Sequence, residues 1–275
     1  MIPDVELDAR LKQAVEAIAH ADALLIGAGA GMGVDSGLPD FRGNQGFWTA
    51  YPPFQGRSFS EISNPYWFRR DPELAWGFFG HRFNLYRQKQ PHAGFAILRR
   101  WGERLPLGYF VFTSNVDGHF QRAGFLEQRV IECHGSIHYL QCANRCVDVI
   151  WPAENVQVDV DENTVRALSE LPRCPHCQGV ARPNILMFDD WDWLQARCAE
   201  QYHHYQHWLR QVADQRVVAI ELGAGLAIPT VRRECERHGD VLIRVNPREA
   251  DTLTGGIGIP HGALATLKRM DALMS

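Results

Sequence analysis

Short apolar runs alternate with amphipathic segments along most of this chain. Leu7, Leu11 and Ile18 share one face of an N-terminal helix pattern, and further helical patterns cover 195–213 and 261–273. Near-continuous apolar runs predict five buried strands, at 21–29, 108–115, 129–136, 215–225 and 240–246. Because such strands alternate with helices, the pattern predicts an α/β fold, a Rossmann-like parallel sheet with helices on both faces.

Two segments interrupt this alternation. The first, 44–90, is rich in aromatic residues and ends in the helical run PELAWGFFGHRFNLYRQ. The second, 137–182, holds four closely spaced cysteines. A length of 275 residues allows one large domain or a core domain with an inserted module. We expect a Rossmann-like domain formed by 1–45, 91–136 and 183–275. We expect the helical insert at 46–90 and the small cysteine module at 137–182.

Two glycine-rich turns follow predicted strands. Gly29-Ala30-Gly31 ends the first strand and Gly223-Ala224-Gly225 ends the fourth. Glycine lets backbone N–H groups approach a phosphate without a Cβ in the way, although a single such turn also serves tight packing. Because two such turns on one sheet are harder to assign to packing alone, they favour nucleotide binding.

Polar side chains follow the second and third predicted strands. Ser114, Asn115 and Asp117 come after one strand, and His134 lies at the end of the next. Parallel sheets bind ligands at the carboxyl ends of their strands. A lone histidine is more often an ordinary core or surface residue, but this position makes His134 a candidate acid or base.

Four cysteines form two close pairs. Cys142 and Cys146 are spaced C-x3-C, and Cys174 and Cys177 are spaced C-x2-C. Four thiolates at these spacings can close a tetrahedral zinc site without an open position, which predicts a structural metal. Buried free cysteines are the alternative, and the histidines at 138 and 176 are further possible ligands. We expect one structural Zn²⁺ held by the four cysteines.

Charge and composition narrow the class of protein. The net charge is −4, and no dense Lys/Arg run accompanies the cysteine pairs, so we expect no direct nucleic-acid binding. No apolar run approaches the ~20 residues of a membrane span, and the N-terminus is a charged helix pattern rather than a signal peptide. These features predict a cytoplasmic protein in a reducing compartment, with no membrane partner.

Taken together, the motifs resemble those of a sirtuin, the family of NAD-consuming protein deacylases and ADP-ribosyltransferases. The resemblance runs from about residue 22 to the C-terminus. Its segments, in chain order, are Gly29-Ala30-Gly31, Gly37-Leu38-Pro39-Asp40-Phe41-Arg42-Gly43, Thr113-Ser114-Asn115-Val116-Asp117, His134-Gly135-Ser136, the four cysteines, 183–190, 223–229 and Val245-Asn246-Pro247.

The resemblance implies an enzyme that deacylates acyl-lysine in a protein or peptide. NAD would be consumed, yielding nicotinamide and 2′-O-acyl-ADP-ribose. His134 would be the general base, Asn115 would contact the ribose and a water, and Asp117 would bind the nicotinamide carboxamide. The acceptor peptide would pair as a strand near 185–190. The segment 46–90 would begin with the loop over the cofactor. The NAD-binding positions would be Gly29, Ala30, Gly31, Asp40, Phe41, Arg42, Ser114, Asn115, Asp117, Gly223, Ala224, Gly225 and Asn246.

Several positions depart from the family pattern. Ala224 and Gly225 replace a Thr-Ser pair, which removes two hydroxyls that usually serve the dinucleotide, and Asp189-Asp190 replaces Gly-Glu at the peptide strand. Each lost hydrogen bond to a ligand weakens binding by roughly 1 kcal/mol unless water or backbone substitutes. These changes keep two alternatives open: a protein ADP-ribosyltransferase or NAD glycohydrolase, and a non-enzymatic sensor of NAD or ADP-ribose.

The helical insert bears on the choice of acyl group. Sirtuins that prefer acidic acyl chains use a Tyr-x-x-Arg pair, and this chain has Phe79 and Arg82 at those places. The expected arrangement is a phenyl ring in the core and a solvated arginine. We therefore predict no preference for succinyl-lysine.

Overall fold

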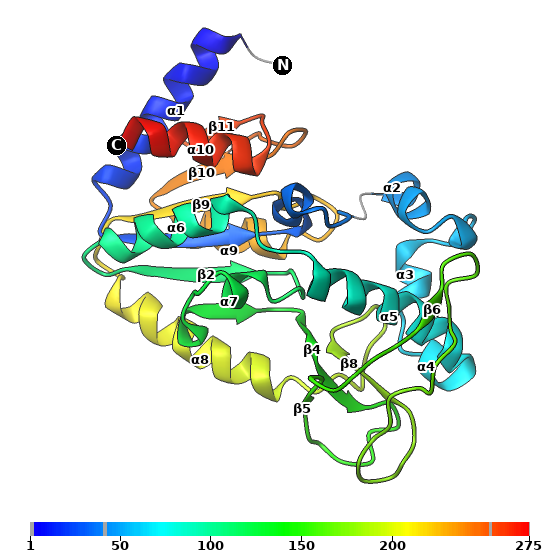
Figure 1. Cartoon of the computed structure of the whole chain (residues 1–275). Coiled ribbons are helices and arrows are strands. Elements are labelled where there is room, and N and C mark those ends of the chain that lie inside the picture. Colours follow the sequence, from blue (N-terminus) through cyan, green and yellow to red (C-terminus); the bar gives the residue numbers. More distant parts are fainter. Residues whose placement is uncertain (1–2, 41–42, 253–254, 275) are drawn as a thin grey trace.

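The computed structural model describes residues 3–40, 43–252 and 255–274. Its centre is a six-stranded sheet in which every neighbouring pair is parallel, in the order β11-β10-β9-β1-β2-β3 (Figure 1). The strands are β1 (Ala23–Ala28), β2 (Tyr109–Thr113), β3 (Val130–Glu132), β9 (Val217–Leu222), β10 (Val241–Val245) and β11 (Ile257–Ile259). The predicted Rossmann-like sheet is confirmed, and its sixth strand, β11, is one that the hydrophobic pattern did not indicate.

Helices cover both faces of this sheet, as predicted. Successive side chains of a strand point to opposite faces, so Leu24 and Ile26 enter one apolar core while Leu25 enters the other. The first core is completed by α1 (Asp4–Ala19), α6 (Ala93–Arg104) and α10 (Ala263–Met274), and the second by α8 (Ala196–Gln211) and α9 (Thr230–His238). Among the described residues, no helix combines the length and the apolar character needed to cross a bilayer.

The predicted end of the third strand is wrong. The third strand ends at Glu132 rather than continuing to 136, and after a two-residue turn the chain enters β4 (Gly135–Cys142) of another sheet. Gly135 has φ +77°, a conformation that glycine adopts without a Cβ penalty, and it allows this change of direction.

A second lobe joins the aromatic segment to the cysteine segment. Its apolar core combines rings such as Phe47, Trp76 and Phe78 with Ile137 and Ile185. The helices are α2 (Gly43–Ala50), α3 (Phe59–Ile62), α4 (Trp67–Arg70) and α5 (Pro72–Gln88); the small antiparallel sheets are β5 (Trp151–Pro152) with β4 and β8 (Ala181–Ile185), and β6 (Val160–Asp161) with β7 (Arg166–Ala167). The predicted domain boundary at 136 lies within β4, and the boundary at 183 lies within β8. The division of the chain at these residues stays a prediction.

Short helices fill the connections: α7 (His119–Arg122) and the 3₁₀ turns at Ala30–Ser36, Pro52–Phe54 and Glu127–Arg129. Strand β1 lies between β2 and β9, which is where the chain direction along the sheet reverses (Figure 1). Open parallel sheets bind ligands at this switch point, outside the carboxyl ends of the strands. The fold therefore directs attention to the turns that follow β1, β2 and β9.

Candidate functional site

The two glycine turns meet at the switch point. The N–H of Gly31 donates to the carbonyl of Gly223 (3.0 Å), and the N–H of Gly29 donates to the carbonyl of Leu222 (3.0 Å). A Cβ on Gly29 would lie 2.6 Å from the Cα of Ala224, and one on Gly223 would lie 2.4 Å from the carbonyl carbon of Gly31. Glycine is therefore required at both positions for the turns to pack, in addition to any role toward a ligand.

The turn after β2 is hydrogen-bonded to the first glycine turn. Asn115 donates its side-chain N–H to the carbonyl of Gly29 (3.0 Å), and the hydroxyl of Thr113 donates to the carbonyl of Ala28 (3.0 Å). The backbone N–H of Ser114 donates to that same carbonyl (3.1 Å). These bonds bring the sequence-predicted residues of the second strand next to the first glycine turn.

A cavity of about 220 Å³ opens between the turns. Its lining includes Gly31, Gly223, Asp40 and Arg248, and the Arg248 guanidinium lies 3.3 Å from an Asp40 carboxylate oxygen. Asp40 is thus at the crevice, as expected. Phe41 and Arg42 lie outside the described residues.

Asp117 lies in the interior, two residues after Asn115. The side chain accepts a hydrogen bond from the backbone N–H of His119 (2.9 Å), and His138 bonds the backbone carbonyl of Asp117 through Nε2 (2.8 Å). Burial raises the pKa of the Asp117 carboxyl above its usual range. A carboxyl held in this way can exchange hydrogen bonds with a carboxamide, which has both a donor and an acceptor.

His134 occupies the turn between β3 and β4, where the chain leaves the large sheet. Its backbone carbonyl accepts from the N–H of Leu186 (2.9 Å), and the imidazole makes no hydrogen bond or ion pair within the described part of the chain. Burial lowers the pKa of His134 below its ordinary value, so the ring is neutral at pH 7. A neutral, uncommitted imidazole is suited to accept a proton.

The segment expected to pair with a peptide follows β8, an edge strand of the small sheet. It is held by the bond to His134 and by a bond from the N–H of Phe188 to the carbonyl of Ser63 (3.0 Å). Asp189, which replaces the family's glycine, has φ +54°, and its carboxylate accepts from Asn64 (3.4 Å). Asp190 forms a buried ion pair with Arg182 (2.8 Å). The departure at Asp189-Asp190 thus keeps a glycine-like backbone and adds an internal counter-charge.

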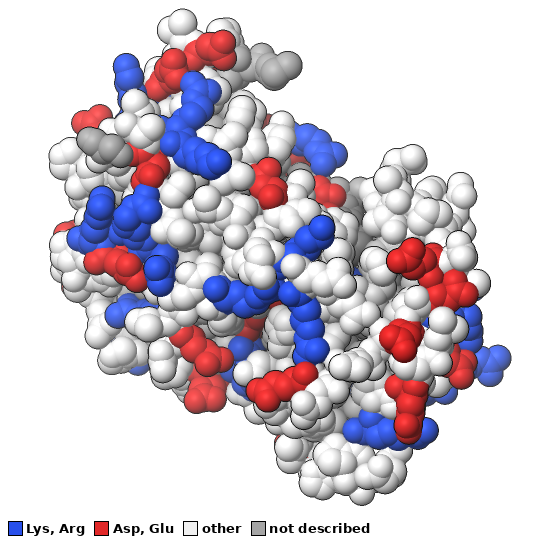
Figure 2. All heavy atoms as spheres, in the orientation of Figure 1, with Lys and Arg blue, Asp and Glu red and all other residues white. Residues whose placement is uncertain are grey.

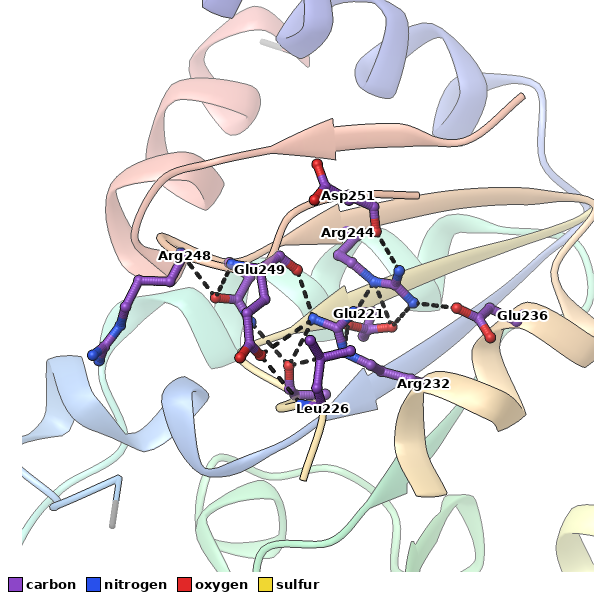
Figure 3. A network of polar contacts seen from close by, with 10 residues as sticks. Glu221, Leu226, Arg232, Glu236, Arg244, Arg248, Glu249 and Asp251 are labelled. Carbon is purple, nitrogen blue, oxygen red and sulfur yellow. Dashed lines mark hydrogen bonds and ion pairs between the residues drawn. The ribbon is translucent and has the colours of Figure 1, made fainter. Parts of the chain in front are cut away.

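A buried charged network underlies the second glycine turn, and the sequence patterns did not reveal it (Figure 3). Glu221 on β9 faces Arg244 on β10 in register, and their side chains are 2.8 Å apart. Arg232 of α9 donates to the carbonyl of Ala224 through Nε and Nη2 (both 3.2 Å) and lies 3.6 Å from the Glu249 carboxylate. The sequence signal for this network is the presence of Glu221 and Arg244 inside otherwise apolar strand runs.

Asn246 is fully buried beside this network. Its side chain donates to the carbonyl of Ala224 (2.9 Å) and accepts from the backbone N–H groups of Arg248 and Glu249 (3.1 Å each). The contact with a ribose that the resemblance implies stays a prediction. What the structure shows is a side chain that shapes the second turn.

The four cysteines converge on one point. Their sulfur atoms all lie within 4.8 Å of one another, with Cys142 and Cys177 at 3.7 Å and Cys146 and Cys174 at 3.6 Å. A tetrahedral zinc with bonds of about 2.3 Å places sulfurs roughly 3.8 Å apart, whereas a disulfide is near 2.05 Å. The cluster is therefore compatible with a structural zinc. His138 is committed to Asp117 and does not belong to the cluster.

The expectation for Arg82 is wrong, while that for Phe79 is confirmed. Phe79 is fully buried, but Arg82 is also buried, at 6% exposure, rather than solvated. The guanidinium lies 5.3 Å from the ring centre of Phe78, and Nε donates to the hydroxyl of Tyr86 (3.0 Å). Aromatic rings stabilise a cation that is removed from water, which explains the burial.

Comparison with curated proteins identifies relatives of this chain. The chain is 32% identical to the NAD-dependent protein deacylase of Aquifex aeolicus (strain VF5) over 59% of each chain, and 28% identical to the NAD-dependent protein deacetylase of Caldivirga maquilingensis over 81% of this chain and 77% of that one. In the first three relatives the match spans only 59%, 65% and 64% of the relative's own length.

Solved structures share the fold. A Sir2 homologue in complex with ADP-ribose matches with a TM-score of 0.70 and 22% identity over 95% of each chain. A Sir2 homologue–NAD complex matches with a TM-score of 0.68 and 22% identity over 96% of this chain and 95% of that one. The model of the Sir2 family matches residues 29–212, two thirds of the sequence. This chain therefore belongs to the Sir2 family, the sirtuins.

Proposed function

We propose that this protein is an NAD-dependent protein-lysine deacylase. The observations that carry the proposal are backbone and side-chain bonds that join three segments. Asn115 is bonded to the first glycine turn (3.0 Å), and the turn that carries His134 is bonded to the segment that holds Asn115 and Asp117, through the N–H groups of Cys133 (2.9 Å, to Thr113) and Ile137 (3.0 Å, to Val116). Relatives named as deacylases and deacetylases support it. The cavity of about 220 Å³ would take part of the dinucleotide, with the backbone of Gly29, Ala30 and Gly31 against the pyrophosphate.

The reaction would use the residues as follows. Asp117 would hold the nicotinamide carboxamide in the interior, and Asn115, tethered to the first glycine turn, would orient the ribose. As nicotinamide leaves, the acyl oxygen of the substrate lysine forms the new bond to the ribose carbon. The neutral imidazole of His134 then takes the proton of a ribose hydroxyl, so that this oxygen attacks the acyl carbon. The resulting tetrahedral carbon would expel the lysine amine, which leaves with a proton. Water would then add to this carbon, and cleavage of its bond to the oxygen on the first ribose carbon would leave the acyl group on the neighbouring ribose oxygen and a hydroxyl on the first carbon.

The proposal is tested by mixing the protein with NAD and peptides carrying acetyl-, succinyl- or long-chain acyl-lysine. We expect 2′-O-acyl-ADP-ribose and free lysine from at least one peptide, and loss of product with His134→Ala. His203→Ala removes an exposed histidine from α8 and serves as the matched control. Absence of product from every acyl peptide would eliminate deacylation.

ADP-ribosyl transfer or plain NAD cleavage is the second candidate. It is favoured by the altered acceptor edge, where Asp189 and its bond to Asn64 replace a glycine. The test is release of nicotinamide without an acyl peptide, with labelled NAD to follow transfer to protein. Release at the rate seen with acyl peptides would favour this candidate, and no release would remove it.

The cysteine module would hold one structural Zn²⁺. All seven cysteines are free thiols in the structure, in keeping with the reducing, cytoplasmic compartment that we propose. Metal analysis of the purified protein should find one zinc per chain, and Cys174→Ser should lose the metal and melt at a lower temperature. The zinc site would be contradicted if the purified protein contained no metal and Cys174→Ser melted at the same temperature as the unmodified protein.

A further inference from the structure

The second glycine turn lacks the two hydroxyls of the family pattern, and a buried arginine lies beneath it. Arg232 is only 5% exposed and lies between the carboxylates of Glu221 (3.8 Å) and Glu249 (3.6 Å), as Figure 3 shows. Burying an ion pair costs desolvation energy that its attraction often fails to repay. A stabilising role alone is therefore a weak explanation for this residue, and its contacts suggest another.

Arg232 holds two backbone carbonyl groups, because its Nη2 donates to the carbonyl of Glu249 (2.6 Å) as well as to that of Ala224. Two of its nitrogens donate to the carbonyl oxygen of Ala224 (3.2 Å each), and Asn246 donates to the same oxygen (2.9 Å). The carboxylate of Glu249 accepts from the N–H of Leu226 (3.2 Å), so the next peptide group is held as well. The orientation of the peptide between Ala224 and Gly225 is thus set from below by three donors.

That orientation determines where the next N–H group points. In a trans peptide the C=O and N–H bonds point in opposite directions, and the described chain contains no cis peptide. Because the carbonyl of Ala224 faces Arg232, the N–H of Gly225 faces away from the buried network. Within the described residues this N–H donates to no acceptor, which leaves it available to a ligand oxygen.

We infer that Arg232 is a positioning residue that replaces the missing hydroxyls by presenting the N–H of Gly225 to a phosphate or ribose oxygen of the dinucleotide. The inference rests on the proposed function, since it assumes that the second turn faces NAD. Arg232 itself touches no ligand; it acts through the carbonyl of Ala224. Because Glu221 and Glu249 neutralise the charge of Arg232, this arrangement orients the N–H of Gly225 without placing a net charge below the turn.

The experiment measures the dissociation constant of ADP-ribose by calorimetry on the full chain. Arg232→Met should weaken binding at least tenfold, and KM for NAD should rise while kcat changes little. Arg233→Met removes the same charge from the exposed side of the same helix and should stay within twofold of the unmodified protein. Equal affinity in Arg232→Met and the unmodified protein would overturn the inference.

A rescue variant separates positioning from general damage. A Cβ at Gly225 would meet only the Glu249 carboxylate, at 3.9 Å, so Gly225→Ser is sterically tolerated and restores one family hydroxyl. The double variant Arg232→Met with Gly225→Ser should recover at least threefold of the lost affinity, and no recovery would contradict the replacement of hydroxyls.

Two further results keep the outcome clear. If Arg232→Met melts below the assay temperature, Arg232→Lys replaces it, because this variant keeps the charge but not the paired donors. Arg232→Lys should bind ADP-ribose about threefold more weakly than the unmodified protein, at an unchanged melting temperature. Unchanged affinity for ADP-ribose would overturn the inference. Absence of ADP-ribose binding by the unmodified protein would overturn the proposed function together with this inference, whereas normal binding by the Arg232 variants would overturn this inference alone.

Discussion

The two glycine turns have the same sequence, Gly-Ala-Gly, and end neighbouring strands, yet they are held in place by different forces. The turn at 29–31 is fixed by backbone hydrogen bonds and by one neutral side chain, Asn115. The turn at 223–225 is held by a buried charged network that includes Arg232 and Glu249. Identical tripeptides therefore reach the same crevice with different supports.

The different supports of the two turns suggest different roles for them in the reaction. Asn115 is bonded to the first turn, and backbone bonds join the segment that holds Asn115 and Asp117 to the turn that carries His134. Burial raises the pKa of Asp117 and lowers the pKa of His134, so both changes favour the uncharged form. Beneath the second turn, Glu221 is paired with both Arg232 and Arg244, while Arg248 lines the cavity. We infer that chemistry depends on the first turn, while the second contributes to binding. Four predictions follow from this division, in order of expected size.

The largest effect is expected from His134→Ala. Removal of a general base lowers turnover by about 10²–10⁴-fold, while the dissociation constant of ADP-ribose should change little. In the unmodified protein activity should fall as the pH drops through the pKa of His134, which burial places below its usual range, and it should be level near pH 7. Rate measurements from pH 5 to 8 check this, and a steep dependence above pH 7 would contradict it.

Breaking the charged network should chiefly affect stability. Glu221→Gln leaves Arg244 and Arg232 without their buried carboxylate and should lower the free energy of unfolding by about 3 kcal/mol. Glu236→Gln removes the outer, 28% exposed partner of Arg244 and should cost less than about 1 kcal/mol. Urea unfolding of both variants distinguishes the two positions. Equal losses would mean that the network is not centred on Glu221.

A substitution within the second turn tests the packing of the two turns. Gly223 has φ +62°, and a Cβ there would meet the backbone of Gly31 at 2.4 Å, so Gly223→Ala should cost about 2–3 kcal/mol. A Cβ at Gly225 would meet only the Glu249 carboxylate, at 3.9 Å, so Gly225→Ala should stay within about 0.5 kcal/mol. Thermal melts followed by circular dichroism give both values. A harmless Gly223→Ala would show that the turns do not pack as described.

The smallest effect on stability is expected from loss of the ion pair between Arg248 and Asp40 at the crevice. Arg248 is 68% exposed in its side chain, lies 3.3 Å from Asp40, and projects away from the buried network in Figure 3. Exposed ion pairs contribute little, so Arg248→Gln should change the free energy of unfolding by less than about 0.5 kcal/mol, with a smaller change at high salt. A loss above 1.5 kcal/mol, measured by urea unfolding, would show that the bridge holds the turns together.

Much of this arrangement was predictable from local pattern. The apolar runs identified five of the six strands, and cysteine spacing identified the cluster of four thiols. The end of β3 was missed because the apolar and polar residues from 129 to 136 read as one strand, whereas the turn at Cys133-His134 carries the chain into another sheet. Strand β11 was missed because three residues are too few for a periodicity to show.

Residue identity alone determined the order of the motifs, the glycines of both turns and the family resemblance, because each depends on neighbours a few positions apart. Tertiary structure alone decided which charges are buried. Arg82 is enclosed by rings from two helices, and Glu221 meets arginines 11 and 23 positions further along the chain. Whether a charge is solvated depends on contacts between distant segments, and no local pattern encodes them.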